Sequence, residues 1–201
     1  MNPHTRRAQT AGPVGMLECA INDPAEALRG VAVVCHPHPL HGGTMDNKVV
    51  QTLARAFVQL GYRAVRFNFR GIGASQGAWD AGRGEIDDAL AVVASARDAA
   101  LPFALGGFSF GAYVASQTAA RLDGVERLVL VAPAVTNFSM APVSQDSVLI
   151  HGEADDVVPL ADVLAWARPT PLPITVIPGA GHFFHGQLPL LKQLVVGAWH
   201  R

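Results

Sequence analysis

One serine stands in a sequence pattern that is typical of nucleophilic catalysis. Ser109 lies at the centre of the G-x-S-x-G pattern that runs from Gly107 to Gly111, between an apolar run and an alanine-rich run with helical spacing. A serine in such a strand–turn–helix segment sits on a sharp, strained turn with its hydroxyl clear of the sheet. The flanking glycines are needed because side chains there would collide in the turn. The pattern and its context predict that Ser109 is a nucleophile.

A second match to the same pattern lacks this context. Ser75 lies between Gly73 and Gly77, and the residues that follow are AWDAGRGE, with two glycines and no helical period. A nucleophile on a strand–turn–helix segment needs a helix directly after it. The sequence therefore predicts that Ser75 is a loop residue.

A serine hydroxyl needs a base, and the base needs a third group that orients it. With this type of turn, a carboxylate and then a histidine follow the serine along the chain. After the apolar run of SVLIHGEADDVVP the loop offers Glu153, Asp155 and Asp156, and the next run, PITVIPGAGHFFHG, ends at His182. We expect Asp155 to be the acid, with Asp156 as the alternative. We expect His182 to be the base in preference to His185, because His182 directly follows the glycine turn.

Each of these residues has a simpler explanation when it is taken alone. Acidic residues in a polar loop are most often solvated surface residues. A single histidine near a strand end is most often structural. Here the three residues occur in the required order, each directly after an apolar run. Their type, order and position together favour the catalytic interpretation.

Acyl transfer also requires N–H donors that face the developing oxyanion. We expect one donor to be the backbone N–H of Phe110, the residue after the nucleophile. The second should come from the loop HPHPLHGG, residues 36–43, whose two prolines have no N–H group. The remaining candidates in that loop are His38 and Leu40. We favour His38 because of its distance from the preceding strand.

Three histidines of the same loop offer a different chemistry. His36, His38 and His41 have an H-x-H-x-x-H spacing that could bind zinc or iron. The spacing superficially resembles the H-x-H-x-D-H loop of metallo-β-lactamase-like hydrolases, but Leu40 stands where that loop has an aspartate. A metal-dependent hydrolase is therefore the alternative to a serine hydrolase. The structural interpretation places His36 at the strand end and the other two at the mouth of a pocket.

The elements that must position these residues alternate between short apolar runs and longer runs of helical period. The predicted strands are Val14–Ile21, Val31–Cys35, Ala64–Phe69, Phe103–Gly106, Arg127–Val131, Val148–His151 and Ile174–Ile177. The predicted helices are Asp46–Leu60, Glu85–Ala99, Phe110–Leu122, Leu160–Ala167 and Leu188–His200. This alternation predicts an α/β fold, a mostly parallel sheet of about seven strands with helices on both faces. Such folds carry their sites at the carboxyl ends of the strands.

The composition excludes several classes of protein. The 201 residues are 50% hydrophobic, with 15 basic and 16 acidic residues. That balance gives no basic surface for nucleic acid, and no apolar run reaches the ~18 residues of a membrane span. The amino-terminal residues show no apolar stretch of a secretory signal, so we expect a cytoplasmic protein. We expect a flexible tail over residues 1–12 and a single domain over residues 13–201.

The chain resembles the α/β-hydrolase superfamily, and within it the small, cap-less bacterial hydrolases related to dienelactone hydrolases. The resemblance rests on HPHPLHGGTMDNKVV, RFNFRGIGASQG, GFSFGAYVA, LIHGEADDVVP and GAGHFFHG. It implies a triad of Ser109, Asp155 and His182. Dienelactone hydrolases carry a cysteine nucleophile, so the serine here points to esterase chemistry. The short connection over residues 132–147 leaves no room for a cap domain.

These observations predict a serine hydrolase that cleaves a small carboxylic ester or thioester through an acyl-enzyme, without a cofactor. The expected binding partner is a small-molecule acyl ester substrate, and we expect no binding to nucleic acid or to a membrane. The sequence does not decide the oligomeric state. We expect an open pocket of apolar side chains from Leu40, Phe108, Phe110, Phe183 and Phe184. The alternative from another class is a non-catalytic protein that retains the fold.

Overall fold

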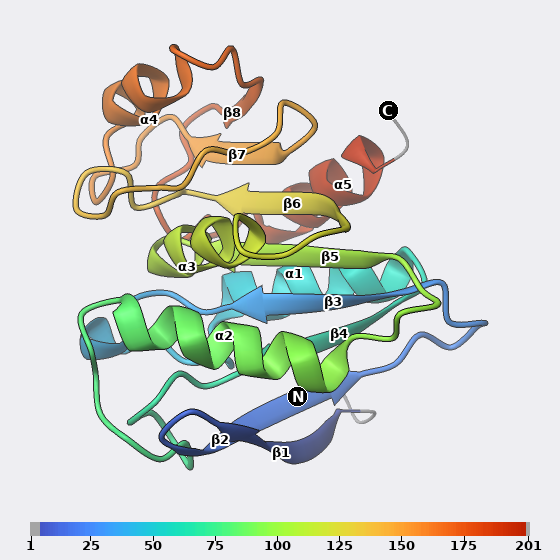
Figure 1. Cartoon of the computed structure of the whole chain (residues 1–201). Helices are drawn as coiled ribbons and strands as arrows, with labels where there is room; N and C mark the ends of the chain where they lie inside the picture. Colours follow the sequence, from blue (N-terminus) through green and yellow to red (C-terminus); the bar gives the residue numbers. More distant parts are fainter. Residues whose placement is uncertain (1–4, 200–201) are drawn as a thin grey trace.

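Eight strands form one sheet within residues 5–199, the part of the chain that this computed structural model describes (Figure 1). They are β1 (Arg6–Gly12), β2 (Gly15–Asn22), β3 (Gly30–Cys35), β4 (Tyr62–Phe67), β5 (Phe103–Phe108), β6 (Val125–Val131), β7 (Val148–Gly152) and β8 (Ile174–Ile177). Their order across the sheet is β1-β2-β4-β3-β5-β6-β7-β8. β1 pairs antiparallel with β2, β2 pairs antiparallel with β4, and the other neighbours are parallel. The predicted mostly parallel sheet is confirmed.

Five α-helices cover the two faces of the sheet in the described part of the chain. They are α1 (Lys48–Gln59), α2 (Arg83–Ala96), α3 (Phe110–Ala119), α4 (Leu160–Ala167) and α5 (Leu188–Ala198). α1 and α5 pack on one face, and α2, α3 and α4 pack on the other (Figure 1). The helix predicted over residues 188–200 ends at Ala198, and His200 lies outside the described residues.

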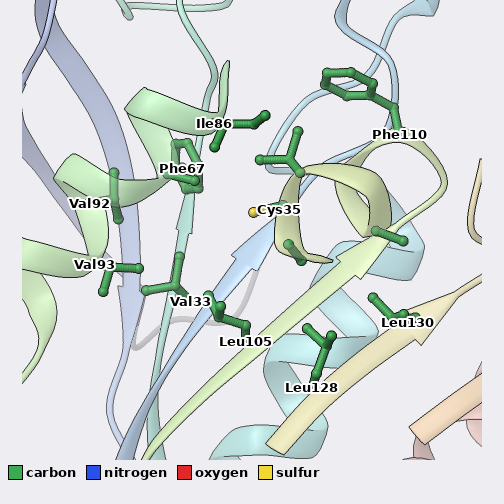
Figure 2. Close-up of a cluster of buried hydrophobic side chains, with 14 of the residues drawn as sticks. Val33, Cys35, Phe67, Ile86, Val92, Val93, Leu105, Phe110, Leu128 and Leu130 are labelled. Carbon is green, nitrogen blue, oxygen red and sulfur yellow. The ribbon is translucent and has the colours of Figure 1, made fainter. Parts of the chain in front are cut away.

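The central strand β3 shows why the chain is so apolar. All its residues are buried. Val31 and Val33 belong to the core beneath α2 and α3, part of which Figure 2 shows. Ala32 and Val34 belong to the core beneath α1 and α5. Side chains alternate between the two faces of a strand, so a strand covered on both faces needs an apolar residue at every position. The mean hydropathy of +0.25 reflects this two-sided burial.

The expected tail over residues 1–12 is wrong from Arg6 onward, because β1 begins there and continues to Gly12. β1 forms a hairpin with β2 at the edge of the sheet. Its sequence, RRAQTAG, lacks apolar alternation since most of its side chains are exposed or half-buried. Arg7 stabilises the edge through an ion pair with Asp46, with Nη2 2.8 Å from Oδ2. Residues 1–4 lie outside the described residues.

The carboxyl ends of the six parallel strands share one edge of the sheet, and the arrowheads of β3, β6 and β7 point toward it at the left of Figure 1. The connection from β6 to β7, residues 132–147, contains no helix or strand. The predicted absence of a cap domain is therefore confirmed. Within residues 5–199 no helix is both long enough and apolar enough to cross a bilayer.

Candidate active site

The turn between β5 and α3 holds Ser109 in a strained conformation. Its φ is 56° and its ψ is −119°, a region that residues with a Cβ rarely adopt. Four backbone hydrogen bonds hold it there. Its N–H donates to the carbonyl of Val131 at 2.9 Å, and its carbonyl accepts from Ala112 at 2.9 Å, Ala134 at 3.3 Å and Tyr113 at 3.4 Å. The side chain remains partly accessible, since 8% of Ser109 is exposed. This is the geometry expected of a nucleophile at a strand–helix turn.

Both glycines of the pattern are required by backbone packing. A Cβ at Gly107 would collide with the carbonyl oxygen of Gly111. A Cβ at Gly111 would collide with the carbonyl oxygen of Cys35 at the end of β3. The first turn of α3 therefore lies directly against β3 and β5. This close approach brings the loop after β3 next to Ser109.

The structure brings together the three residues that the sequence favours. The Oγ of Ser109 is 3.0 Å from Nε2 of His182 and donates its hydrogen bond to that nitrogen. The Nδ1 of His182 is 2.8 Å from Oδ2 of Asp155 and donates to the carboxylate. Only 4% of His182 and 6% of Asp155 are exposed. The alternatives, Asp156 and His185, are exposed side chains outside this chain of hydrogen bonds.

Backbone donors hold the carboxylate of Asp155. Its Oδ1 accepts hydrogen bonds from the N–H groups of Val157 at 2.9 Å and Val158 at 2.8 Å. Burial opposes ionisation of this carboxyl, but the hydrogen bonds from His182 and from the two valines keep its pKa below the usual range. Asp155 is thus a fixed anion beside the imidazole of His182.

A second buried histidine supports the acid loop, and the sequence interpretation missed it. The Nε2 of His151, at the end of β7, donates to the carbonyl of Val158 at 2.9 Å and lies 3.6 Å from Oδ2 of Asp155. Burial lowers the pKa of His151, so the ring stays neutral beside the acid. The only signal in the sequence was its place directly before Gly152. At Gly152 a Cβ would collide with the carbonyl oxygen of Ala180, which shows how closely β7 approaches the loop of His182.

The expected pocket residues divide into two groups. Leu40 and Phe183 are 63% and 44% exposed, at the edge of the sheet that carries the site. Phe108 and Phe184 have no exposed surface and Phe110 is 1% exposed, so the expectation that these three line an open pocket is wrong. The reason is alternation along β5, which turns Phe108 into the core beneath α1 and α5. The Phe108 ring instead supports His182, with 5.0 Å between the ring centroids.

The loop after β3 offers two candidate oxyanion donors, and one of these N–H groups already donates a hydrogen bond within the loop. The N–H of Leu40 donates to Nδ1 of His38 at 3.2 Å. Among the described residues, neither the N–H of His38 nor that of Phe110 has a hydrogen-bond partner. The carbonyl of His38 accepts from His41 and Gly43, which fixes the peptide path of the loop. Of the two alternatives left open by the sequence, His38 is the one with a free donor.

The three histidines of this loop do not converge on a common point. Both ring nitrogens of the buried His36 are engaged, because Nδ1 donates to the carbonyl of Pro37 at 2.7 Å and Nε2 accepts from the N–H of Phe69 at 3.1 Å. His38 and His41 stack on each other, with 4.4 Å between the ring centroids. Within residues 5–199 no group of three His, Cys, Asp or Glu side chains is placed to hold a metal ion.

Ser75 is a structural residue. Its Oγ donates to the carbonyl of Asn68 at 2.6 Å and accepts from the N–H of Glu18 at 2.9 Å. The Asn68 side chain in turn accepts from the N–H of Met45 at 2.8 Å and donates to Glu18 at 2.8 Å. The motif RFNFRGIGASQG thus ties β2, β4 and the loop after β3 together.

Comparison with known proteins places this geometry in a family. The model of the family Hydrolase_4, described as "Serine aminopeptidase, S33", matches residues 32–148, more than half of the chain. The chain belongs to this family. The matched residues include Ser109 and end before Asp155 and His182.

Three bacterial proteins are similar to this α/β-hydrolase over most or all of its length. An uncharacterized protein from Rickettsia prowazekii is 33% identical over 189 residues, which cover 86% of this chain and 79% of that protein. An α/β serine hydrolase homologue from Coxiella burnetii is 41% identical, with a TM-score of 0.84 over 96% of each chain. An α/β serine hydrolase without a lid, from Xanthomonas campestris, is 36% identical, with a TM-score of 0.89 over 100% of this chain and 96% of that one. The predicted superfamily is confirmed, and the narrower resemblance to dienelactone hydrolases stays a prediction.

Burial of His36 predicts a loss of stability in mild acid. Burial, opposed by the hydrogen bond to Pro37, lowers the pKa of His36 to about 3. A histidine in the unfolded chain has a pKa of about 6.5, so the unfolded chain binds more protons between these two pKa values. The free energy of unfolding therefore falls as the pH drops through that window. At pH 5 this group alone lowers the free energy of unfolding by about 2 kcal/mol.

Urea unfolding of the wild type and of His36→Gln at pH 7 and pH 5 measures this contribution. We expect the variant to be less stable at pH 7. Its loss of stability between the two pH values should be smaller than that of the wild type by about 2 kcal/mol. The same loss in both proteins would contradict the assignment.

Proposed function

We propose that this α/β-hydrolase cleaves a carboxylic ester or a thioester through an acyl-enzyme on Ser109. The observation that carries the proposal is the continuous chain of hydrogen bonds from Ser109 through His182 to Asp155. A serine hydroxyl that donates to a neutral imidazole, which itself donates to a buried carboxylate, has the three groups that activate an alcohol for attack. No cofactor takes part in this chemistry.

The reaction follows from these positions. The Oγ of Ser109 forms a bond to the carbonyl carbon while its proton moves to Nε2 of His182, and the carbonyl electrons move onto oxygen. Collapse of this intermediate expels the alcohol or thiol, which takes its proton from His182. Water then attacks the acyl-enzyme by the same route and releases the carboxylic acid. Asp155 stabilises the imidazolium that forms in each half.

The oxyanion would be held by the backbone N–H groups of Phe110 and His38. Both donors lack partners among the described residues, and both lie on segments that pack against the turn of Ser109. Because a backbone donor is fixed by the fold, it needs no reorganisation when the negative charge develops.

The surroundings of Ser109 favour a small, uncharged substrate. No cap covers the edge of the sheet, and the exposed side chains beside the site include the apolar Leu40 and Phe183. The family description names serine aminopeptidases, so aminoacyl 4-nitroanilides are the natural comparison substrates. A clear preference for those anilides over esters would replace the ester assignment and keep the same nucleophile.

Ser109→Ala tests the nucleophile, and Ser75→Ala is the matched control. Removal of the attacking oxygen should reduce the kcat for 4-nitrophenyl acetate by at least about a thousandfold. The thermal unfolding midpoint should stay near that of the wild type. Ser75→Ala removes two hydrogen bonds, one of them buried, and should lower stability by about 1–3 kcal/mol without a comparable loss of kcat. Steady-state kinetics and thermal scans measure both, and full activity of Ser109→Ala would rule out the proposal.

His38→Pro tests the second oxyanion donor, because the φ of His38 is −53° and suits proline. The variant removes the N–H as well as the ring, whereas His38→Ala removes the ring alone. We expect the kcat of His38→Pro to fall by a further factor of about 100 to 1,000 relative to His38→Ala. Equal kcat values for the two variants would show that the His38 N–H does not bind the oxyanion.

A further inference from the structure

A group of aromatic rings lies directly beside the proposed oxyanion donors. It begins with the rings of Phe110 and His38, whose centroids are 5.3 Å apart. Four separate segments contribute to the group: the loop after β3, the loop before α2, the first turn of α3 and the connection from β6 to β7. We call it the aromatic wall, and its residues are His38, His41, Trp79, Phe110, Tyr113 and Phe138.

Trp79 and Phe138 flank the two rings at the centre of the aromatic wall. The Trp79 ring lies 4.7 Å from that of His38 and 5.2 Å from that of Phe110. The Phe138 ring lies 5.9 Å from that of His38 and 4.9 Å from that of Phe110. Phe110 is buried, whereas Trp79, Phe138 and His38 are each half-buried. The wall therefore presents ring surface to solvent around a buried phenylalanine.

The position of His182 decides which part of a substrate would meet this surface. His182 must give its proton to the leaving group, so the leaving group lies on the side of His182. The exposed ring there is Phe183, 5.1 Å from the His182 ring and not part of the aromatic wall. With the carbonyl oxygen on the N–H groups of Phe110 and His38, the remaining substituent is the acyl group. We therefore expect it to lie on the side of the rings of those two residues, which supply the donors.

The aromatic wall holds no residue with a fixed charge. None of its members is an acid, a lysine or an arginine. Burial, and then the neighbouring His41, lowers the pKa of His38. Close to Trp79 in the sequence, Asp80 and Arg83 have opposite charges and form an ion pair at 3.0 Å. A neutral, planar group suits this surface better than an ionic one.

We propose that the aromatic wall selects substrates whose acyl group carries an aromatic ring. This inference rests on the proposed function, because it assigns the acyl side of the same site. A ring placed on half-buried aromatic side chains gains edge-to-face and offset-stacked contacts beyond the burial of its area. A saturated ring of similar size buries comparable area without those contacts.

Two esters with the same leaving group isolate this effect. The acyl groups of 4-nitrophenyl 3-phenylpropanoate and 4-nitrophenyl 3-cyclohexylpropanoate differ in aromaticity and little in size. We expect the wild type to prefer the phenyl ester by about two- to tenfold in kcat/KM, the value of one or two aromatic contacts. The 4-nitrophenyl acetate activity of the same preparation, compared with that of Ser109→Ala, reports separately on the proposed function.

Trp79→Leu and Phe138→Leu, checked for folding by circular dichroism, should each move the phenyl-to-cyclohexyl ratio toward one. Trp166→Leu is the matched control, because Trp166 is a half-buried tryptophan on α4 outside the aromatic wall. Its ratio should equal that of the wild type. Two variants at separate sites keep the test decisive if one of them does not fold.

The outcomes separate the two proposals. A wild-type ratio near one, or a ratio that neither variant changes, would overturn the aromatic selection while Ser109-dependent acetate hydrolysis persists. Absence of any Ser109-dependent hydrolysis would overturn the proposed function itself. A ratio that falls in Trp79→Leu or Phe138→Leu, and not in Trp166→Leu, supports the assignment of the wall.

Discussion

The backbone contact between the first turn of α3 and the end of β3 is the constraint on which the site depends. Gly111 lies so close to the carbonyl of Cys35 that no side chain fits between them. Two residues before this contact, Ser109 has a positive φ, a strain that costs about 1–3 kcal/mol. The strained conformation is maintained because the buried alanines of α3 pack against a sheet that is covered on both faces. The same contact brings the loop of His38 beside Ser109, so one packing requirement positions both the nucleophile and a donor.

Polar residues at the ends of the strands are held mainly by the backbone. Asp155 accepts from two valine N–H groups, and His151 donates to the carbonyl of Val158. His36 joins the loop after β3 to the segment that follows β4. Such bonds fix a side chain without help from a covering domain. An edge of the sheet that carries no cap can therefore still hold a serine, a histidine and an aspartate within hydrogen-bond distance of one another. At this open edge the proposed aromatic wall would be the surface that selects substrates.

Much of this arrangement could be predicted because it depends on local order in the sequence. The buried strands and the positions of Asp155 and His182 followed from apolar runs and from the residues directly after them. β1 was missed because an edge strand with exposed side chains shows no apolar alternation. Phe108 and Phe184 were misplaced because proximity in sequence to Ser109 and His182 does not tell which way a side chain points. The choice between His38 and Leu40, and the aromatic wall, depend on contacts between distant segments that spacing alone does not show.

The site at which a fluorophosphonate probe reacts tests most directly whether Ser109 is the nucleophile, because only an activated serine attacks such a probe. Peptide mapping by mass spectrometry after labelling should place the adduct on Ser109 in the wild type. In His182→Ala, which lacks the base, the rate of labelling should fall by orders of magnitude. An adduct on Ser75, or equal labelling rates in the wild type and His182→Ala, would contradict the claim that Ser109 is the nucleophile of this hydrolase.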